Sequence, residues 1–312
     1  MSVSYLANVV VCAYHNVGFR CLQELLEQGA HVSAVFTHED SSSEEIWFES
    51  VQELAKSHQI PCYMTDVNLP ENIELIHRIA PDYLFSFYYR SMINKEILEI
   101  PKKGALNLHG SLLPRYRGRV PINWAVIQGE TETGATLHYM VEKPDAGDIV
   151  AQERVSIDFD DTALDVFHKV TEAAVRIVRR SWPQLLTGTA QRTAMDLSAG
   201  SYFGGRKPAD GLIDWGKSSL EIYNLIRGVT HPYPGAFTFL DGEKVLIWRA
   251  LLKAGSGRAG EVLSDQPFLV GTGNGLLEVL SLQYGAEDEV DALLFVKKHP
   301  VLGKFFTSQP AS

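Results

Sequence analysis

Asn107 and His109 are the residues of this 312-residue sequence whose types and spacing best suit a catalytic site. The segment 105–109, ALNLH, alternates apolar and polar side chains as a strand does, and the glycine- and proline-containing loop that follows ends it. Residues two apart on a strand project from the same face, so the amide and the imidazole would lie side by side. An amide can donate a hydrogen bond to an oxyanion, and an imidazole moves protons near pH 7. The pair predicts an acyl-transfer site, whereas a turn-forming Asn beside a buried structural His is the alternative.

A carboxylate that could complete this site is Asp145. It lies in the turn-rich segment 143–148, between two strand-like segments at 136–141 and 149–157. Asp148 is the nearest competing carboxylate. His138 competes with His109 as the reactive histidine, but it has no Asn two residues away. We therefore expect His138 to be structural.

The same residues carry a resemblance to a known family. NLHGSLLP at 107–114, followed by Arg117-Gly118 and by DAGDIV at 145–150, resembles the signature of the folate-dependent formyltransferases. The similarity runs from 9–15 through 85–90 to 231–237, and so covers nearly the whole chain. The family includes enzymes that formylate methionyl-tRNA, phosphoribosylglycinamide and nucleotide-linked amino sugars. Within it, the chain most resembles the formyltransferase half of the bifunctional polymyxin-resistance enzymes, which act on UDP-4-amino-4-deoxy-L-arabinose during lipid A modification.

The resemblance implies a role for each site residue and a formyl donor, 10-formyltetrahydrofolate. Asn107 would stabilise the oxyanion, His109 would move protons, and Asp145 would orient His109 and favour its imidazolium form. Three arginines at 115, 117 and 119 would suit an anionic ligand, and the resemblance favours Arg119. The implied folate contacts are Ser91, Met92, Ile93, Arg119, Val141, Glu142, Lys143, Pro144 and Asp145.

The charge of the chain bears on the acceptor. A formal net charge of −10, from 38 acidic and 28 basic residues, argues against a partner held through its phosphate backbone. The tRNA-acting relatives carry a basic insertion where this sequence has an acidic loop at 39–45. A nucleotide-linked amino sugar is therefore the expected partner, and no nucleic acid. UDP-4-amino-4-deoxy-L-arabinose is favoured, another UDP-, dTDP- or GDP-linked amino sugar stays open, and methionyl-tRNA is disfavoured. A binding protein without catalysis would have no need of a paired base and oxyanion donor.

Other patterns exclude further classes of protein. Three scattered cysteines form no disulfide framework, and the histidines lack the spacing of metal ligands, so we expect no metal. No glycine-rich dinucleotide motif follows the first strand-like segment. The N-terminus has no leader pattern, and its apolar stretch is shorter than the ~20 residues of a membrane helix. We expect a cytoplasmic protein without membrane insertion; homo-oligomer formation and fusion to a decarboxylating dehydrogenase domain stay open.

The sequence patterns around the candidate site predict strands and helices that alternate as in an α/β fold. An apolar strand at 6–13, a helix at 18–28 and a strand at 31–36 form a βαβ unit, and a buried strand follows at 83–87. A long helix is expected at 162–186, with Pro183 kinking or shortening its last turn. These elements predict a Rossmann-like, mostly parallel sheet in a catalytic domain at 1–188, followed by a linker at 189–205. Short strands with close turns then predict a small OB-like β-barrel domain at 206–312.

Overall fold

The computed structural model describes residues 7–40 and 46–309, in two compact units. The first unit comprises the chain up to Pro121, Glu132–Ser156 and His168–Phe203, and the second comprises Ile122–Thr131, Ile157–Phe167 and the chain from Gly204. The first part of the chain holds the strands β1 (Asn8–Ala13), β2 (His31–Phe36), β3 (Cys62–Tyr63), β4 (Tyr83–Phe87), β5 (Gly104–His109), β6 (Arg117–Gly118), β7 (Glu132–Tyr139), β8 (Ile149–Ser156) and β9 (Tyr202–Phe203). Its helices are α1 (His15–Glu27), α2 (Val51–Ser57), α3 (Pro70–Ile79), α4 (Lys95–Leu98), α5 (Pro121–Ile127), α6 (Ala163–Thr187) and the short η1 (Leu197–Ala199).

The first unit is built on a mixed sheet with the strand order β3-β2-β1-β4-β5-β7-β8. The pairs from β3 to β5 are parallel, while β7 and β8 add to the β5 side in antiparallel orientation. β1 and β4 are apolar and buried along nearly their whole length, as expected of parallel strands covered on both faces. The strand order reverses between β1 and β4, and open α/β sheets bind ligands beyond the carboxyl ends of strands near such a point.

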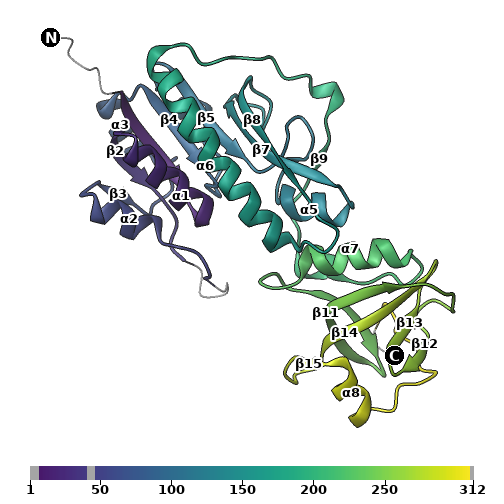
Figure 1. The fold of residues 1–312 in the computed structure, drawn as a ribbon. Coiled ribbons are helices and arrows are strands. Elements are labelled where there is room, and N and C mark those ends of the chain that lie inside the picture. The colour runs from purple at the N-terminus through teal and green to yellow at the C-terminus, as the bar shows by residue number, and fades with distance from the viewer. Residues whose placement is uncertain (1–6, 41–45, 310–312) are drawn as a thin grey trace. The chain divides into compact units, whose positions relative to one another are not determined.

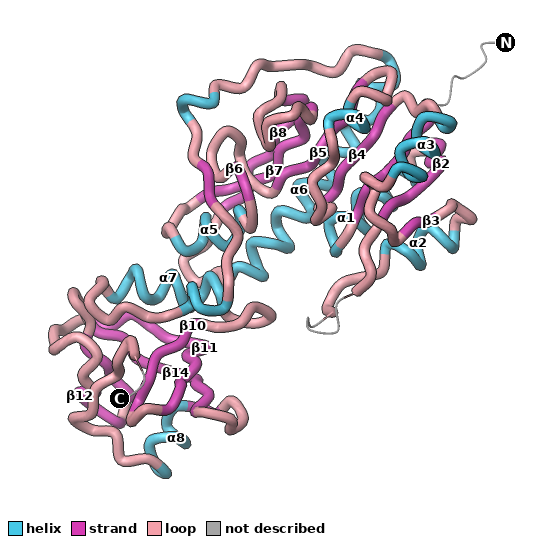
Figure 2. Tube along the Cα trace, turned by 180° about the vertical axis from the view of Figure 1, so that it is seen from behind, coloured by secondary structure: helices cyan, strands magenta, loops and turns pink. Residues whose placement is uncertain are grey.

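Helices cover both faces of this sheet (Figures 1 and 2). Ile76 of α3 and Ile97 of α4 belong to one apolar cluster with Val10 and Leu84. Trp182 of α6 lies against Phe85, with ring centroids 6.1 Å apart, on the other face. These contacts bury the central strands β1 and β4, and β5 pairs with β4 along its length.

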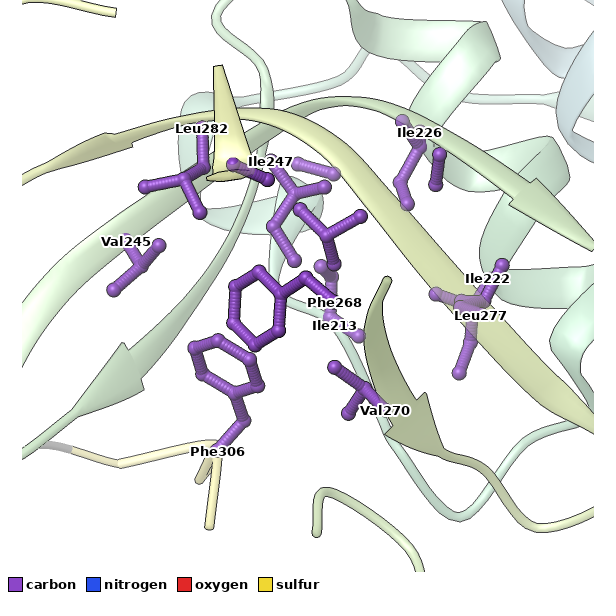
Figure 3. Packing of buried hydrophobic residues seen from close by; sticks show 14 of the residues in the cluster. Ile213, Ile222, Ile226, Val245, Ile247, Phe268, Val270, Leu277, Leu282 and Phe306 are labelled. Carbon is purple, nitrogen blue, oxygen red and sulfur yellow. The ribbon is translucent and has the colours of Figure 1, made fainter. Parts of the chain in front are cut away.

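The second unit is an antiparallel β domain packed around its own apolar core (Figure 3). Its sheet has the order β10-β11-β14-β13-β12, with β15 beside β14. Main-chain hydrogen bonds join 303–307 to Phe239 of β10 on one edge and to Gly260 and Val262 on the other. This segment therefore covers both open edges of the sheet. The elements are η2 (Pro208–Gly211), α7 (Ser219–Val229), β10 (Ala236–Leu240), β11 (Glu243–Lys253), β12 (Val262–Asp265), β13 (Phe268–Gly271), β14 (Leu276–Tyr284), β15 (Val290–Asp291) and α8 (Ala292–Lys298).

The predicted fold class is confirmed: a mostly parallel α/β domain precedes an antiparallel β domain. One local prediction was wrong: helix α1 begins at His15 rather than at Gly18. Helix α6 has nearly the predicted bounds of 162–186, and it continues through Pro183 to Thr187 without being shortened. The segment 189–205, predicted as a linker, contains β9, which pairs with β6 of the first unit. Leu6 and residues 41–45 of the acidic loop lie outside the described residues.

Candidate active site

Asn107 and His109 lie at the carboxyl end of β5, as predicted. Figure 2 shows β5 between β4 and β7. Antiparallel pairing places His138 of β7 directly opposite Asn107, and Thr136 opposite His109. His109 is 7% exposed and His138 is 1% exposed, while Asn107 is half-buried. Because directly opposed residues share a face of the sheet, Asn107, His109 and His138 form one polar cluster.

Asp145 comes from the β7–β8 connection and reaches both histidines. Its Oδ1 lies 3.5 Å from His109 Nδ1 and 3.7 Å from His138 Nε2. Its Oδ2 accepts a hydrogen bond of 2.9 Å from the main-chain N–H of Gly118. Asp145 itself has φ of 50°, in the left-handed region that few non-glycine residues adopt. Strain of this kind persists only where the surroundings enforce it, as they do at functional sites.

The loop after β5 fixes the ring of His109. His109 Nε2 lies 2.8 Å from the carbonyl oxygen of Tyr116, which can only accept, so Nε2 carries a proton. Ser111 Oγ donates to the carbonyl of Arg115 at 2.7 Å, and Thr136 Oγ1 donates to the carbonyl of Ser111 at 2.6 Å. In the neutral ring, Nδ1 is therefore the nitrogen with the lone pair, and it faces Asp145.

His138, which the sequence predicts to be structural, lies in the same cluster. Its Nε2 lies 3.2 Å from Asn107 Nδ2, and its Nδ1 lies 2.8 Å from the carbonyl oxygen of Tyr139. Burial lowers the pKa of His138 to about 4, and His109 adds to this; Asp145 and the Tyr139 carbonyl act in the opposite direction. The alternation of residues 136–141 predicts which face of the strand His138 lies on. Its contact with Asn107 depends on the pairing of β7 with β5, which the sequence does not show.

The other carboxylate considered, Asp148, lies apart from the cluster. Its Oδ2 accepts a hydrogen bond of 2.7 Å from Arg192 Nε at the surface. Asp145 therefore remains the carboxylate beside His109. Within residues 7–40 and 46–309, no group of His, Cys, Asp and Glu side chains is arranged to hold a metal ion.

The residues that the resemblance assigns to folate lie on two adjacent loops, after β4 and between β7 and β8, and directly after β6. Lys95 Nζ and Glu142 Oε2, 3.5 Å apart, connect the start of α4, directly after the loop that follows β4, with the β7–β8 loop. Met92 and Val141 on these loops are 60% and 44% exposed, so both apolar side chains are accessible to a ligand.

Other contacts fix the same loops. Asn68 donates to the carbonyl of Met92 at 2.8 Å and accepts from the N–H of Asn94 at 2.9 Å. Ile93 packs partly into the apolar core and Ser91 is half-buried, whereas Lys143 and Pro144 are exposed. Arg119 is exposed just after β6, with its N–H donating to the Phe203 carbonyl. Exposed apolar side chains and main-chain groups of this kind are what a flat heterocycle would need in a binding site.

Asn107, His109 and Asp145 together have the groups that acyl transfer requires. Asn107 supplies an N–H donor, His109 supplies a proton acceptor at Nδ1, and Asp145 supplies the negative charge that stabilises a protonated ring.

Within the described parts of the chain, no helix combines the length and apolar character needed to cross a bilayer.

Comparison with protein families gives two matches along this chain. Residues 10–181 match the family described as "Formyl transferase", and residues 206–300 match "Formyl transferase, C-terminal domain". The two matches cover most of the chain, and they coincide with the α/β sheet and the antiparallel domain respectively.

Solved structures share the fold at low sequence identity. An N-formyltransferase from Helicobacter canadensis, solved with folinic acid and dTDP-3-aminofucose, is 20% identical, with a TM-score of 0.67 over 88% of this chain and 98% of that chain. A 4-N formyltransferase from Francisella tularensis is 23% identical, with a TM-score of 0.62 over 76% of this chain and 93% of that chain. HypX from Aquifex aeolicus is 20% identical, with a TM-score of 0.64 over 94% of this chain; this chain spans 47% of HypX.

Proposed function

The chain belongs to the formyl transferase family, and we propose that it moves a formyl group from 10-formyltetrahydrofolate to the amine of a nucleotide-linked amino sugar. The observation that carries this proposal is the cluster at the end of β5, where Asp145 Oδ1 lies 3.5 Å from His109 Nδ1 and Asn107 shares the same face. We propose Asn107, His109 and Asp145 as the catalytic residues.

The chain's own groups support each step of such a transfer. As the amine attacks the formyl carbon, Asn107 would donate to the oxygen that gains negative charge; loss of one such donor typically costs on the order of 10²–10³ in rate. The amine must also lose a proton. His109 Nδ1 would accept it, because Nε2 is already protonated against the Tyr116 carbonyl.

Asp145 would then stabilise the charged ring from 3.5 Å away. His109 would return the proton to the leaving nitrogen of the donor when the bond from that nitrogen to the formyl carbon breaks. The step needs neither a metal nor a covalent enzyme intermediate.

For the formyl donor, we propose the two loops joined by Lys95 and Glu142 as the binding surface. The exposed side chains of Met92 and Val141 would contact the pterin, and the main chain of Ser91 and Ile93 would supply hydrogen bonds. The segment 141–145 would close over the ring, and Arg119 would pair with a carboxylate of the donor. A folate-like ligand, folinic acid, is bound to the Helicobacter relative, which supports a folate donor here.

For the acceptor, we propose UDP-4-amino-4-deoxy-L-arabinose, on the resemblance of the sequence motifs. A dTDP-linked amino sugar is the second candidate, because the Helicobacter relative was solved with dTDP-3-aminofucose. The net charge of −10 supports either of them over tRNA.

A panel of acceptors tests this proposal. UDP-, dTDP- and GDP-linked 3-amino and 4-amino sugars, with initiator methionyl-tRNA alongside, are each incubated with 10-formyltetrahydrofolate while tetrahydrofolate release and the formylated product are followed. We expect kcat/KM for one nucleotide sugar to exceed that for tRNA by at least about 10³. Turnover of tRNA alone, or of no acceptor, would refute the proposed acceptor class.

A further inference from the structure

His138 lies where it can control the direction of the Asn107 amide. The two residues are directly paired between β5 and β7, and His138 is 1% exposed, so its ring has little freedom to turn. Each ring nitrogen has a neighbour: Nδ1 lies 2.8 Å from the Tyr139 carbonyl oxygen, and Nε2 lies 3.2 Å from Asn107 Nδ2.

These two contacts determine the position of the proton on the ring. A carbonyl oxygen can only accept, so Nδ1 of His138 must donate to Tyr139. In the neutral ring Nε2 then carries the lone pair and accepts a hydrogen bond from the Asn107 amide. The amide thereby has its NH₂ group at His138, and one N–H of that group remains for another acceptor. His109 has the opposite arrangement, with its proton on Nε2 against the Tyr116 carbonyl.

We propose that His138 is a positioning residue, whose neutral ring, protonated at Nδ1, holds the Asn107 amide with its NH₂ group directed at the developing oxyanion. The inference rests on the proposed formyl transfer. An asparagine amide can turn by 180° and would then present its oxygen, which repels an oxyanion. The hydrogen bond from Asn107 to His138 Nε2 selects the productive orientation.

This role requires that His138 stay uncharged at working pH. A protonated ring would direct an N–H at the Asn107 NH₂ group, and two donors would face each other. Asp145 and His109 are the titratable groups beside the ring: Asp145 favours the charged form, His109 opposes it, and burial opposes it most. The Tyr139 carbonyl accepts from either form.

Two substitutions of similar size separate the functions of the two ring nitrogens. In His138→Gln, the side-chain oxygen can reach the place of Nε2 and accept from Asn107. In His138→Asn, the shorter amide can still donate to Tyr139 but offers Asn107 no acceptor. We expect kcat to fall about 10²-fold in His138→Asn with KM for both substrates changed less than about threefold, and to recover at least about tenfold in His138→Gln. Equal losses in both variants, or a His138→Asn variant with wild-type kcat, would overturn the proposal.

A double-mutant cycle shows whether His138 acts through Asn107. If it does, His138→Asn costs less than about threefold in kcat once Asn107 has been changed to Ala, because there is no amide left to orient. A further 10²-fold loss in the Asn107→Ala background would mean an independent role and would contradict the inference.

Nitrogen-15 NMR of histidine-labelled protein gives a readout that needs no acceptor. The spectrum at pH 7 is expected to hold a neutral ring protonated at Nδ1 that disappears in His138→Gln. A His138 ring protonated at Nε2, or charged at pH 7, would overturn the inference even if formyl transfer is established. Lack of turnover with every acceptor would refute the proposed function while leaving this spectroscopic result intact.

Discussion

Two buried clusters of this chain, one in each unit, contain different kinds of side chain. At the end of β5, the first unit buries His109 and His138 beside Asp145, although burying groups that can carry charge is costly. The second unit buries an almost wholly apolar cluster around Phe268 and Phe306 (Figure 3). Such a core stabilises the fold but contains no group that could take part in catalysis. We infer that substitutions in the cluster of the first unit affect rate more than stability, and that those in the core of the second unit do the reverse.

Changing His109 to Ala should give the largest loss of activity. General acid–base catalysis contributes about 10²–10⁴ in rate, so we expect kcat to fall by at least about 10³ while the unfolding transition moves little. Steady-state kinetics and chemical denaturation measure the two effects. His77→Ala, at an exposed position on α3, is the matched control and should match the wild type in both. A His109→Ala enzyme with more than about a tenth of the wild-type kcat would contradict the assigned role.

Phe268→Ala tests the opposite half of the comparison. Phe268 is completely buried, and truncation of a buried Phe costs about 3–5 kcal/mol of unfolding free energy. We expect a loss of this size for the second unit in urea denaturation, with kcat of the folded enzyme within about threefold of the wild type. Phe305→Ala, which truncates a side chain that is 37% exposed, should cost less than about 1 kcal/mol. Equal losses from the two substitutions would show that the apolar core does not carry the stability of this unit.

Gly118→Ala should affect both properties, because Gly118 connects the backbone to the site. Its φ is +99°, and an added Cβ would lie 2.1 Å from the carbonyl oxygen of Phe203. The strand β6 must shift, and the N–H that holds Asp145 shifts with it. We expect a loss of about 1–3 kcal/mol in stability and at least about tenfold in kcat. Gly188→Ala has a similar left-handed φ of +70° but open space around its Cβ, so it should cost about 1 kcal/mol and leave kcat unchanged. Identical kcat values in the two variants would refute the link from Gly118 to Asp145.

The smallest expected effect is a pH dependence of stability from His138. Its pKa is about 4 in the folded chain and near 6.5 when unfolded, so the unfolded state binds more protons between these values. Stability therefore decreases as the pH falls from about 6.5 towards 4, and the contribution levels off below that. Denaturation at pH 7 and pH 5 should show that the wild type loses about 1–2 kcal/mol more than His138→Gln over this interval. Equal losses would mean that His138 does not titrate in this way.

The sequence predicted those parts of the site that depend on local patterns. The alternation of residues 105–109 placed Asn107 and His109 on one strand face, and the turn residues around Asp145 indicated a connection between strands. The contact of His138 with Asn107 was not predicted, because it depends on the register between β5 and β7, which are separated along the chain by a loop that contains β6 and by α5. The left-handed backbone of Asp145 and its hydrogen bond from Gly118 were not predicted either, because the bond joins two loops that are far apart in the sequence.

The same distinction holds for the fold. The apolar strands and the amphipathic helices were predictable, because their periodicity reports which side chains must be buried. The main-chain hydrogen bonds of 303–307 with both edges of the second sheet, and the pairing of β9 with β6, join segments far apart in sequence. The continuation of α6 through Pro183 reflects tertiary packing, in which the neighbouring side chains Trp182 and Leu185 are buried.

Asp145→Asn is the most direct test of the claim that the polar cluster at the end of β5 performs formyl transfer. The substitution keeps the shape of the side chain and a group that can accept from Gly118, but removes the charge beside His109 Nδ1. The decisive measurement is the single-turnover rate of formyl transfer from 10-formyltetrahydrofolate to the best acceptor of the panel. We predict a rate at least about 10³-fold below the wild type in a protein with an unchanged circular dichroism spectrum. A rate within about tenfold of the wild type would contradict the account.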